Sequence, residues 1–249
     1  MVERTVTAAL VIIGNEILSG RTQDANLAFL AQQLNEAGIQ LREARVVPDV
    51  EGDIVEAVNA CRARYDHVFT TGGIGPTHDD ITSACVAKAL GRPYVRHPEA
   101  ERRLRAYYPP GKLNEARLKM ADMPEGAELI DNPVSVAPGF RIENVYVLPG
   151  VPSILQAMFA GLKPSLRGGA RMASRTITLF CPEGDVAKPL GEVQARHPAV
   201  EIGSYPFMRQ DRFGTSLVLR GTDEAEIAAA AEELLTFAKE RGVEILELF

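Results

Sequence analysis

Apolar runs of strand length alternate with amphipathic helical patterns through the first third of the chain. Residues 8–13 are apolar throughout, as expected of a strand that is buried on both faces. A helical pattern follows, in which Leu30 and Leu34 share one face, and further strands are predicted at residues 39–47 and 67–71. Because this alternation is typical of a parallel sheet covered by crossover helices, the sequence predicts a three-layer α/β domain.

Two units are predicted along the chain. Residues 164–171 contain two adjacent glycines among basic and small residues, which is typical of a linker. After it the pattern βαββαβ indicates a small α+β unit of the ferredoxin-like kind. The predicted domains are therefore residues 1–165 and 172–249. Residues 107–138 contain recurrent prolines, so short helices and irregular connections are expected there.

Composition and charge exclude several kinds of partner. The chain has 249 residues with 27 Lys plus Arg and 33 Asp plus Glu, so its net charge is −6. No run of basic residues is longer than two, which gives no general electrostatic reason to bind nucleic acid or an anionic membrane. No apolar stretch approaches the roughly 18 to 20 residues that span a bilayer. We therefore expect a cytoplasmic protein without nucleic-acid or membrane partners.

A glycine- and aspartate-rich run, residues 70–82, directly follows a predicted strand. Its glycines are Gly72, Gly73 and Gly75. They let backbone N–H groups approach a phosphate, and a helix predicted to begin near Asp79 or Asp80 adds a favourable dipole. The two aspartates would repel a bare phosphate, so they favour a bridging divalent cation such as Mg²⁺, or a role in activating water. In the simpler alternative, an aspartate caps the helix and the glycines only turn the chain.

Polar residues after the first strand are candidates for another wall of the same site, because ligands of open α/β sheets bind at the carboxyl ends of strands. Gly14 permits a tight exit from the strand, and Asn15 and Glu16 offer polar groups above the neighbouring strand end. Alternatively, these groups bond only to the loop backbone. Asn26 could bind the ligand or stabilise the start of the following helix.

The run at residues 70–82 resembles the signature of the molybdopterin-binding domain family. This family occurs in molybdenum cofactor biosynthesis proteins, in CinA-type competence/damage-inducible proteins and in the N-terminal part of eukaryotic FAD synthases. Other segments resemble the CinA and FAD-synthase branch in order and spacing: residues 14–20, 22–26, 47–49, 119–121, 137–140, 148–152 and 203–206. The resemblance covers essentially the whole chain and is to a stand-alone CinA-type protein.

The resemblance implies a ligand with phosphate groups and a pterin or nucleotide portion, such as molybdopterin. In some members it also implies metal-dependent cleavage of ADP-ribose or FAD. Carried over to this sequence, it makes Asp80 the acidic catalytic residue and, with Asp79, a metal ligand. Asp49 is a second catalytic candidate, although it could instead cap the helix that follows it. Thr77 and Thr82 would support the phosphate site.

Three functions stay open at this stage. The favoured one is a metal-dependent nucleotide pyrophosphatase that acts on ADP-ribose or FAD. The alternatives are a module that binds molybdopterin or a nucleotide without chemistry, and an enzyme that transfers an adenylyl group to molybdopterin. A homo-oligomer, dimer or trimer, is expected because relatives of this fold commonly self-associate.

Overall fold

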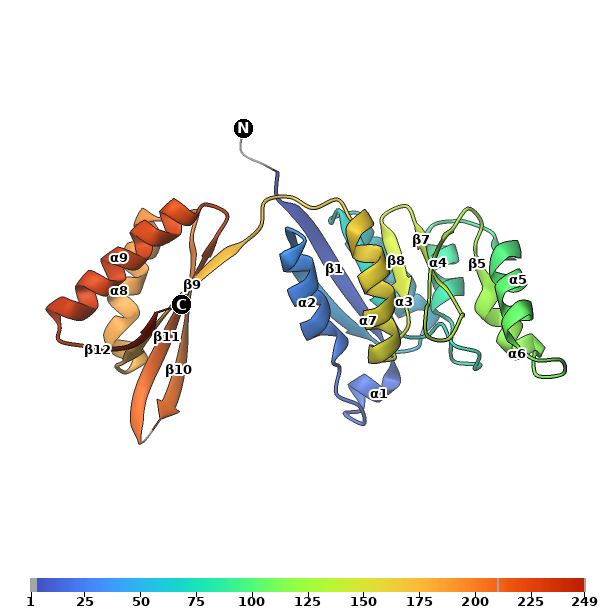
Figure 1. Ribbon diagram of the computed structural model, residues 1–249, viewed down its shortest axis with the longest axis horizontal. Helices are drawn as coiled ribbons and strands as arrows, with labels where there is room; N and C mark the ends of the chain where they lie inside the picture. Colours follow the sequence, from blue (N-terminus) through green and yellow to red (C-terminus); the bar gives the residue numbers. More distant parts are fainter. Residues whose placement is uncertain (1–3, 210, 249) are drawn as a thin grey trace. The chain divides into compact units, whose positions relative to one another are not determined.

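The structure is a computed structural model that describes residues 4–209 and 211–248 (Figure 1). The chain divides into two units, a first unit that ends at Gly169 and a second unit that begins at Ala170. This division lies within residues 164–171, the predicted linker. In the described part of the chain, no helix is both long enough and apolar enough to cross a membrane.

The first unit is built on a six-stranded sheet with the order β2-β1-β3-β8-β7-β6. Its strands are β1 (Val6–Ile13), β2 (Ile39–Val47), β3 (His67–Thr71), β6 (Glu128–Ile130), β7 (Gly139–Ile142) and β8 (Val145–Leu148). The four strands β2, β1, β3 and β8 are parallel to one another, so their carboxyl ends meet at one edge. Strand β7 is antiparallel to both of its neighbours, so the sheet is mixed and mostly parallel.

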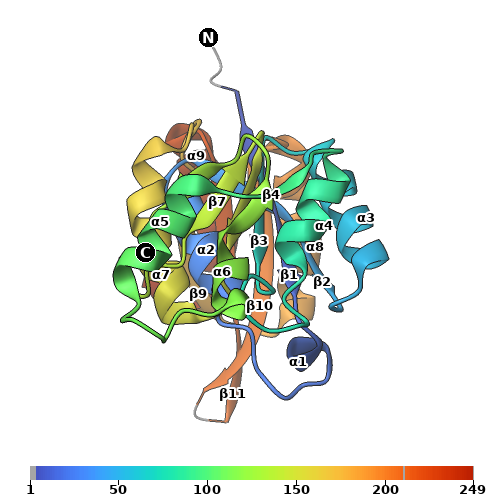
Figure 2. The ribbon, with the colours of Figure 1, turned by 90° about the vertical axis from the view of Figure 1, so that its right-hand side faces the viewer.

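Helices cover both faces of this sheet, as the alternating sequence predicts. Along β1, residues Ala9, Val11 and Ile13 pack in a core with α3 (Glu51–Arg62) and α4 (Thr82–Ala89). The intervening residues Ala8, Leu10 and Ile12 pack on the other face with α2 (Asn26–Glu36) and α7 (Pro152–Leu162). Figure 2 shows α7 and α4 on opposite sides of the sheet. The prediction of a three-layer α/β domain is confirmed.

The middle of the first unit is more regular than the sequence indicates. It contains α5 (Pro98–Tyr107), α6 (Glu115–Leu118) and a 3₁₀ turn at Lys119–Ala121. Strands β4 (Tyr94–Arg96) and β5 (Asp122–Pro124) form a separate antiparallel pair. The expectation of short helices and irregular connections at residues 107–138 is confirmed for α6 and the 3₁₀ turn, but it leaves out the short strands β5 and β6, and β6 extends the main sheet. Strands of three or four residues are too short to produce a recognisable alternation.

The second unit has the βαββαβ order that the sequence predicts. Its elements are β9 (Ala173–Phe180), α8 (Glu183–Arg196), β10 (Glu201–Arg209), β11 (Arg212–Gly221), α9 (Glu224–Glu240) and β12 (Glu244–Leu248). The sheet order β10-β11-β9-β12, with all pairs antiparallel, is that of a ferredoxin-like unit. Residues such as Leu179 and Leu219 pack against Leu234 of α9, which gives this unit its own core.

Candidate functional site

A cavity of about 500 Å³ lies at the carboxyl ends of β1, β3 and β8. Residues 72–75 after β3 and residues 149–152 after β8 line it, together with Glu16 from the segment after β1. Asp80 also lines it, as do residues from the middle region that are described below. The cavity therefore occupies the position where open α/β sheets bind ligands.

Close contacts, one with backbone and one with a side chain, explain the first two glycines of the loop after β3. Gly72 has φ +98°, and a Cβ there would lie 2.2 Å from the carbonyl oxygen of Ile13. Gly73 has φ +66°, and its Cβ would lie 2.2 Å from the hydroxyl of Thr82. That buried hydroxyl donates to the carbonyl of Gly72 at 2.9 Å, and the Thr82 N–H donates to the Gly73 carbonyl at 3.0 Å. Thr82 therefore fixes the loop from beneath and does not line the cavity itself.

Asp80 explains the third glycine, because a Cβ on Gly75 would lie 2.7 Å from one carboxylate oxygen of Asp80. The same oxygen accepts from the backbone N–H of Thr77 at 2.8 Å and from its hydroxyl at 2.5 Å. Helix α4 begins at Thr82, its N-cap residue is Ile81, and no side chain caps it. The helix thus begins two residues after Asp80, close to the expected start, and Asp80 closes a turn with Thr77 instead of capping the helix. Neither aspartate caps this helix, so the simpler alternative for them does not apply.

Asp79 shares the hydroxyl of Thr77 with Asp80, since one of its carboxylate oxygens also lies 2.5 Å from that hydroxyl. The hydroxyl has one proton and can donate to only one of the two carboxylates at a time. The hydrogen bond from Thr77 lowers the pKa of Asp79, and its own backbone N–H, His78 and Lys119 add to this effect. Lys119 donates to the Thr77 carbonyl at 2.7 Å, which brings a positive charge to the loop. Asp79 itself is not among the described residues that line the cavity.

The segment after β1 places one of its predicted residues in the cavity. Glu16 lines it, and a Cβ on Gly14 would lie 2.5 Å from both carboxylate oxygens of Glu16. Asn15 donates its backbone N–H to the carboxylate of Asp49 at 2.9 Å. Asp49, which follows β2, thus fixes the segment after β1. It does not cap the following helix α3, because no side chain caps that helix. Asp49 and Asn15 are not among the described residues that line the cavity.

Asn26, the first residue of α2, fixes the loop after β8. Its side-chain amide donates to the carbonyl of Gly150 at 2.8 Å, and the residue is 3% exposed. Its carbonyl oxygen Oδ1 is buried and has no hydrogen-bond partner among the described residues. A Cβ on Gly150 would lie 3.3 Å from the Cα of Gly72, so the two loops approach closely. Asn26 therefore acts on the cavity wall through Gly150.

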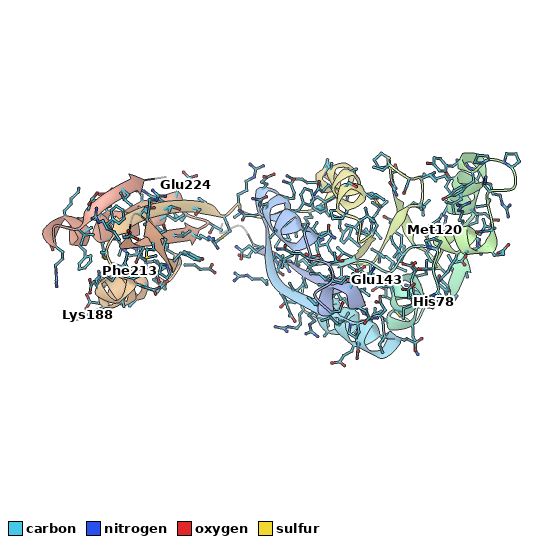
Figure 3. All side chains as sticks on the ribbon, turned by 90° about the horizontal axis from the view of Figure 1, so that it is seen from below. His78, Met120, Glu143, Lys188, Phe213 and Glu224 are labelled. Atoms are coloured by element: carbon cyan, nitrogen blue, oxygen red, sulfur yellow. The ribbon has the colours of Figure 1, made fainter. Side chains whose placement is uncertain are left out.

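Sequence reasoning missed the wall that comes from the middle region. This wall consists of Met120, Asn132, Ser135 and Ala137. Met120 is labelled in Figure 3. The same view labels His78, which belongs to the loop after β3 and has a side chain that is 98% exposed. The Asn132–Pro133 pair is a turn signal, but it could not show that the turn lies beside a cavity.

The oxygen donors around Thr77 fit a hard divalent cation such as Mg²⁺, which prefers carboxylate and water ligands. Asp79 and Asp80 could hold such an ion. Within residues 4–209 and 211–248, no group of three or more His, Cys, Asp and Glu side chains is placed to hold a metal. A cation at these aspartates would therefore take its remaining ligands from water and from phosphate oxygens.

Comparisons with known proteins show which families the two units resemble. Residues 9–168 match the family described as "Probable molybdopterin binding domain", and residues 171–246 match "FAD synthase, middle domain". A protein from Pyrobaculum calidifontis is 42% identical over 211 residues, which cover 80% of each chain. A CinA-like protein from Desulfosudis oleivorans is 39% identical over 209 residues, which cover 79% of this chain and 51% of the relative. The chain thus spans about half the length of that CinA-like relative.

The fold comparison covers about two thirds of the chain. The crystal structure of the protein CinA from Thermoplasma acidophilum matches with a TM-score of 0.62 at 34% identity, over 65% of this chain and 99% of that one. The family match spans well over half of the chain, and the relatives named above are similar over most of it. The chain therefore belongs to the molybdopterin-binding domain family and is of the CinA-like type.

Proposed function

We propose that this protein is a metal-dependent hydrolase that cleaves the pyrophosphate of a nucleotide such as ADP-ribose or FAD. The observation that carries the proposal is the Asp80 carboxylate, which lines the cavity beside a preformed glycine loop and caps no helix. The match of the second unit to a domain of FAD synthase supports a nucleotide ligand. Backbone N–H groups of residues 73–75 would hold the diphosphate, as in other glycine-rich loops at strand ends, whereas the Gly72 N–H donates to the Leu148 carbonyl at 3.2 Å.

The charges of the cavity favour a ligand that arrives with a cation. Of the described residues that line it, Glu16 and Asp80 are charged, and both are acidic. Asp80 and Asp79 would hold a divalent ion, which lowers the pKa of bound water and offsets the charge that develops on the phosphate. Glu16 can accept the proton of the attacking water. The water oxygen then bonds to the phosphorus of the AMP half, the bond from this phosphorus to the bridging oxygen breaks, and AMP is released together with ribose 5-phosphate from ADP-ribose or FMN from FAD.

The test is to incubate the full chain with ADP-ribose or FAD and with Mg²⁺ or Mn²⁺, and to measure AMP. Asp80→Asn is expected to lower the rate by about 100-fold or more, because it removes a charged group that positions the cation. The matched control is Asp53→Asn, at an exposed position of α3, which should keep the wild-type rate. No AMP with either substrate and either metal would overturn the hydrolase proposal.

A second candidate is a module that binds molybdopterin or a nucleotide without chemistry. It is favoured by the lack, among the described residues, of a group of three or more side chains placed to hold a metal. This candidate predicts ligand-dependent thermal stabilisation of the wild type with no product. Asp80→Asn would then bind the ligand as tightly or more tightly, because one negative charge near the phosphates is removed. Measuring binding and AMP release on the same two proteins separates the candidates.

A further inference from the structure

The loop at residues 132–137 forms a rigid part of the cavity wall. The side-chain amide of Asn132 donates to the Ser135 hydroxyl and to the Ala137 carbonyl, each at 2.8 Å. Its carbonyl oxygen accepts the backbone N–H groups of Val134 and Ser135, each at 3.0 Å. These four bonds use the full hydrogen-bonding capacity of an asparagine side chain. One side chain thus ties the whole loop together.

The backbone of this loop is strained at Val136. The N–H of Ala137 donates to the carbonyl of Ser135 at 2.8 Å, and Val136 between them has φ +63°. A three-residue turn with positive φ is rare, and a β-branched residue is a strong outlier there. Such strain persists where the surroundings over-determine the conformation, and it concentrates at ligand sites. Here Asn132 supplies that constraint, and the Val136 side chain packs against the core.

Ser135 is left with one unused donor. Its N–H is bound by Asn132, its carbonyl is bound by Ala137, and its hydroxyl oxygen accepts from Asn132. The remaining hydroxyl proton is not engaged by any bond recorded among the described residues. Because Ser135 lines the cavity, this proton is available to a ligand. The donor is neutral, and the bonds around it fix its position.

The lining of the cavity suits an aromatic ring better than a second phosphate. Apolar side chains, including Ile74, Met120 and Ile154, form much of the cavity lining. No lysine or arginine is among the described residues that line it, whereas Glu16 and Asp80 are negative. Apolar walls with a few fixed polar groups are typical of sites for flat organic ligands.

We propose that Ser135 is a specificity-determining residue that donates its hydroxyl proton to an acceptor nitrogen of an aromatic heterocycle, and that Asn132 is its positioning residue. The inference rests on the proposed function only in assuming that the same cavity takes the nucleotide, with its phosphates at the glycine loop. Recognition of the ring is then separate from recognition of the diphosphate.

Calorimetric titration of the full chain with ADP and with inorganic pyrophosphate, both with Mg²⁺, tests this separation. Ser135→Ala should raise the Kd for ADP by about 2- to 12-fold, the range of one neutral hydrogen bond, and leave the Kd for pyrophosphate unchanged. Ser174→Ala, at an exposed position of the second unit, is the matched control and should change neither. The assignment fails if ADP does not bind, if its Kd is unchanged, or if both Kd values rise equally.

Analogues of ADP in which one ring nitrogen is replaced by C–H identify the acceptor. One analogue should bind the wild type more weakly than ADP does, and Ser135→Ala should remove that difference. Asn132→Asp should remove it as well, because its carboxylate accepts the Ser135 proton while keeping the two backbone bonds. An analogue that Ser135→Ala still discriminates would overturn the proposal.

AMP release is measured separately on the same proteins, so that the two proposals fail independently. Ring discrimination through Ser135 without any AMP release supports this inference and overturns the hydrolase. AMP release with no effect of Ser135→Ala on ADP binding supports the hydrolase and overturns the role of Ser135.

Discussion

At the scale of single residues, the loop after β3 requires glycine at positions where a side chain would collide with neighbouring atoms. Gly72 and Gly73 stand where a Cβ would meet the Ile13 carbonyl and the Thr82 hydroxyl. The sequence predicts a tight loop at this position, because glycines directly after a strand allow backbone conformations that other residues rarely adopt. It does not predict the contact of Asp49 with Asn15, since these residues are 34 positions apart and meet only in the folded sheet.

Gly72→Ala is expected to lower the free energy of unfolding of the first unit by about 3 kcal/mol, measured by urea denaturation of the full chain. The added Cβ would lie 2.2 Å from backbone that cannot move aside, at a φ of +98°. Gly20→Ala is the matched control, because Gly20 has φ +72° but nothing within 4 Å of its Cβ. It should cost about 1 to 2 kcal/mol, the price of the left-handed conformation alone. Equal losses in the two variants would show that close approach does not require glycine at position 72.

At the scale of elements, prediction succeeded where apolar residues are dense and failed where they are sparse. Strand β3 is predicted with the bounds that the structure gives, because it is a continuous run of strand-forming residues that ends at the first glycine of the loop. Strand β2 is also predicted with its observed bounds, because Gly38 and Pro48 delimit it even though it contains charged residues. Helix α5 was missed because it buries only Ala100 and Leu104. Ion pairs such as Arg105–Glu101 cover its remaining surface. The part of the cavity wall at Ser135 was also missed, because it lies among short elements that show no periodicity in the sequence.

His197, at the end of α8, contacts two glutamates of α9, and the strength of these contacts depends on pH. Its Nδ1 lies 3.1 Å from a Glu226 carboxylate oxygen, and its Nε2 lies 3.1 Å from one of Glu233. Both nitrogens can donate only when the ring is protonated. The hydrogen bonds to Glu226 and then Glu233 accordingly raise the pKa of His197 above its ordinary value of 6.5.

The stability of the second unit should therefore fall as pH rises. A raised pKa in the folded state means that the stabilisation is fully present below pH 6.5 and is lost as pH passes through the raised pKa. We expect a loss of about 1 kcal/mol, because both carboxylates are partly exposed and screened by water. Urea denaturation at a series of pH values, from 6.5 to above the raised pKa, should show this loss of unfolding free energy in the wild type and not in His197→Gln. His78→Gln, at a residue that is 98% exposed, should behave as the wild type does.

At the scale of the whole molecule, the lining of the cavity and the core of the second unit share no described residue. Every described residue that lines the cavity belongs to the first unit, from Glu16 to Ile154. The second unit has its own core, which includes none of these residues. The segment before Ala170 belongs with the first unit, because Gly169 donates its N–H to the Gly38 carbonyl at 3.0 Å. In addition, Nε2 of the buried His67 lies 3.0 Å from the carbonyl of Arg167.

This division predicts how two truncated chains behave. A fragment of residues 1–169 keeps both sheet-face cores and the docked segment, so it should melt at the temperature of the first unit in the full chain. A fragment of residues 1–165 loses the bonds made by Arg167 and Gly169 and leaves the buried Nε2 of His67 without an acceptor. Losing these bonds costs about 1 to 2 kcal/mol, so its melting temperature should be about 5 °C lower in a calorimetric scan. Equal melting of the two fragments would mean that the docked segment contributes nothing, and the first unit would then end at residue 165.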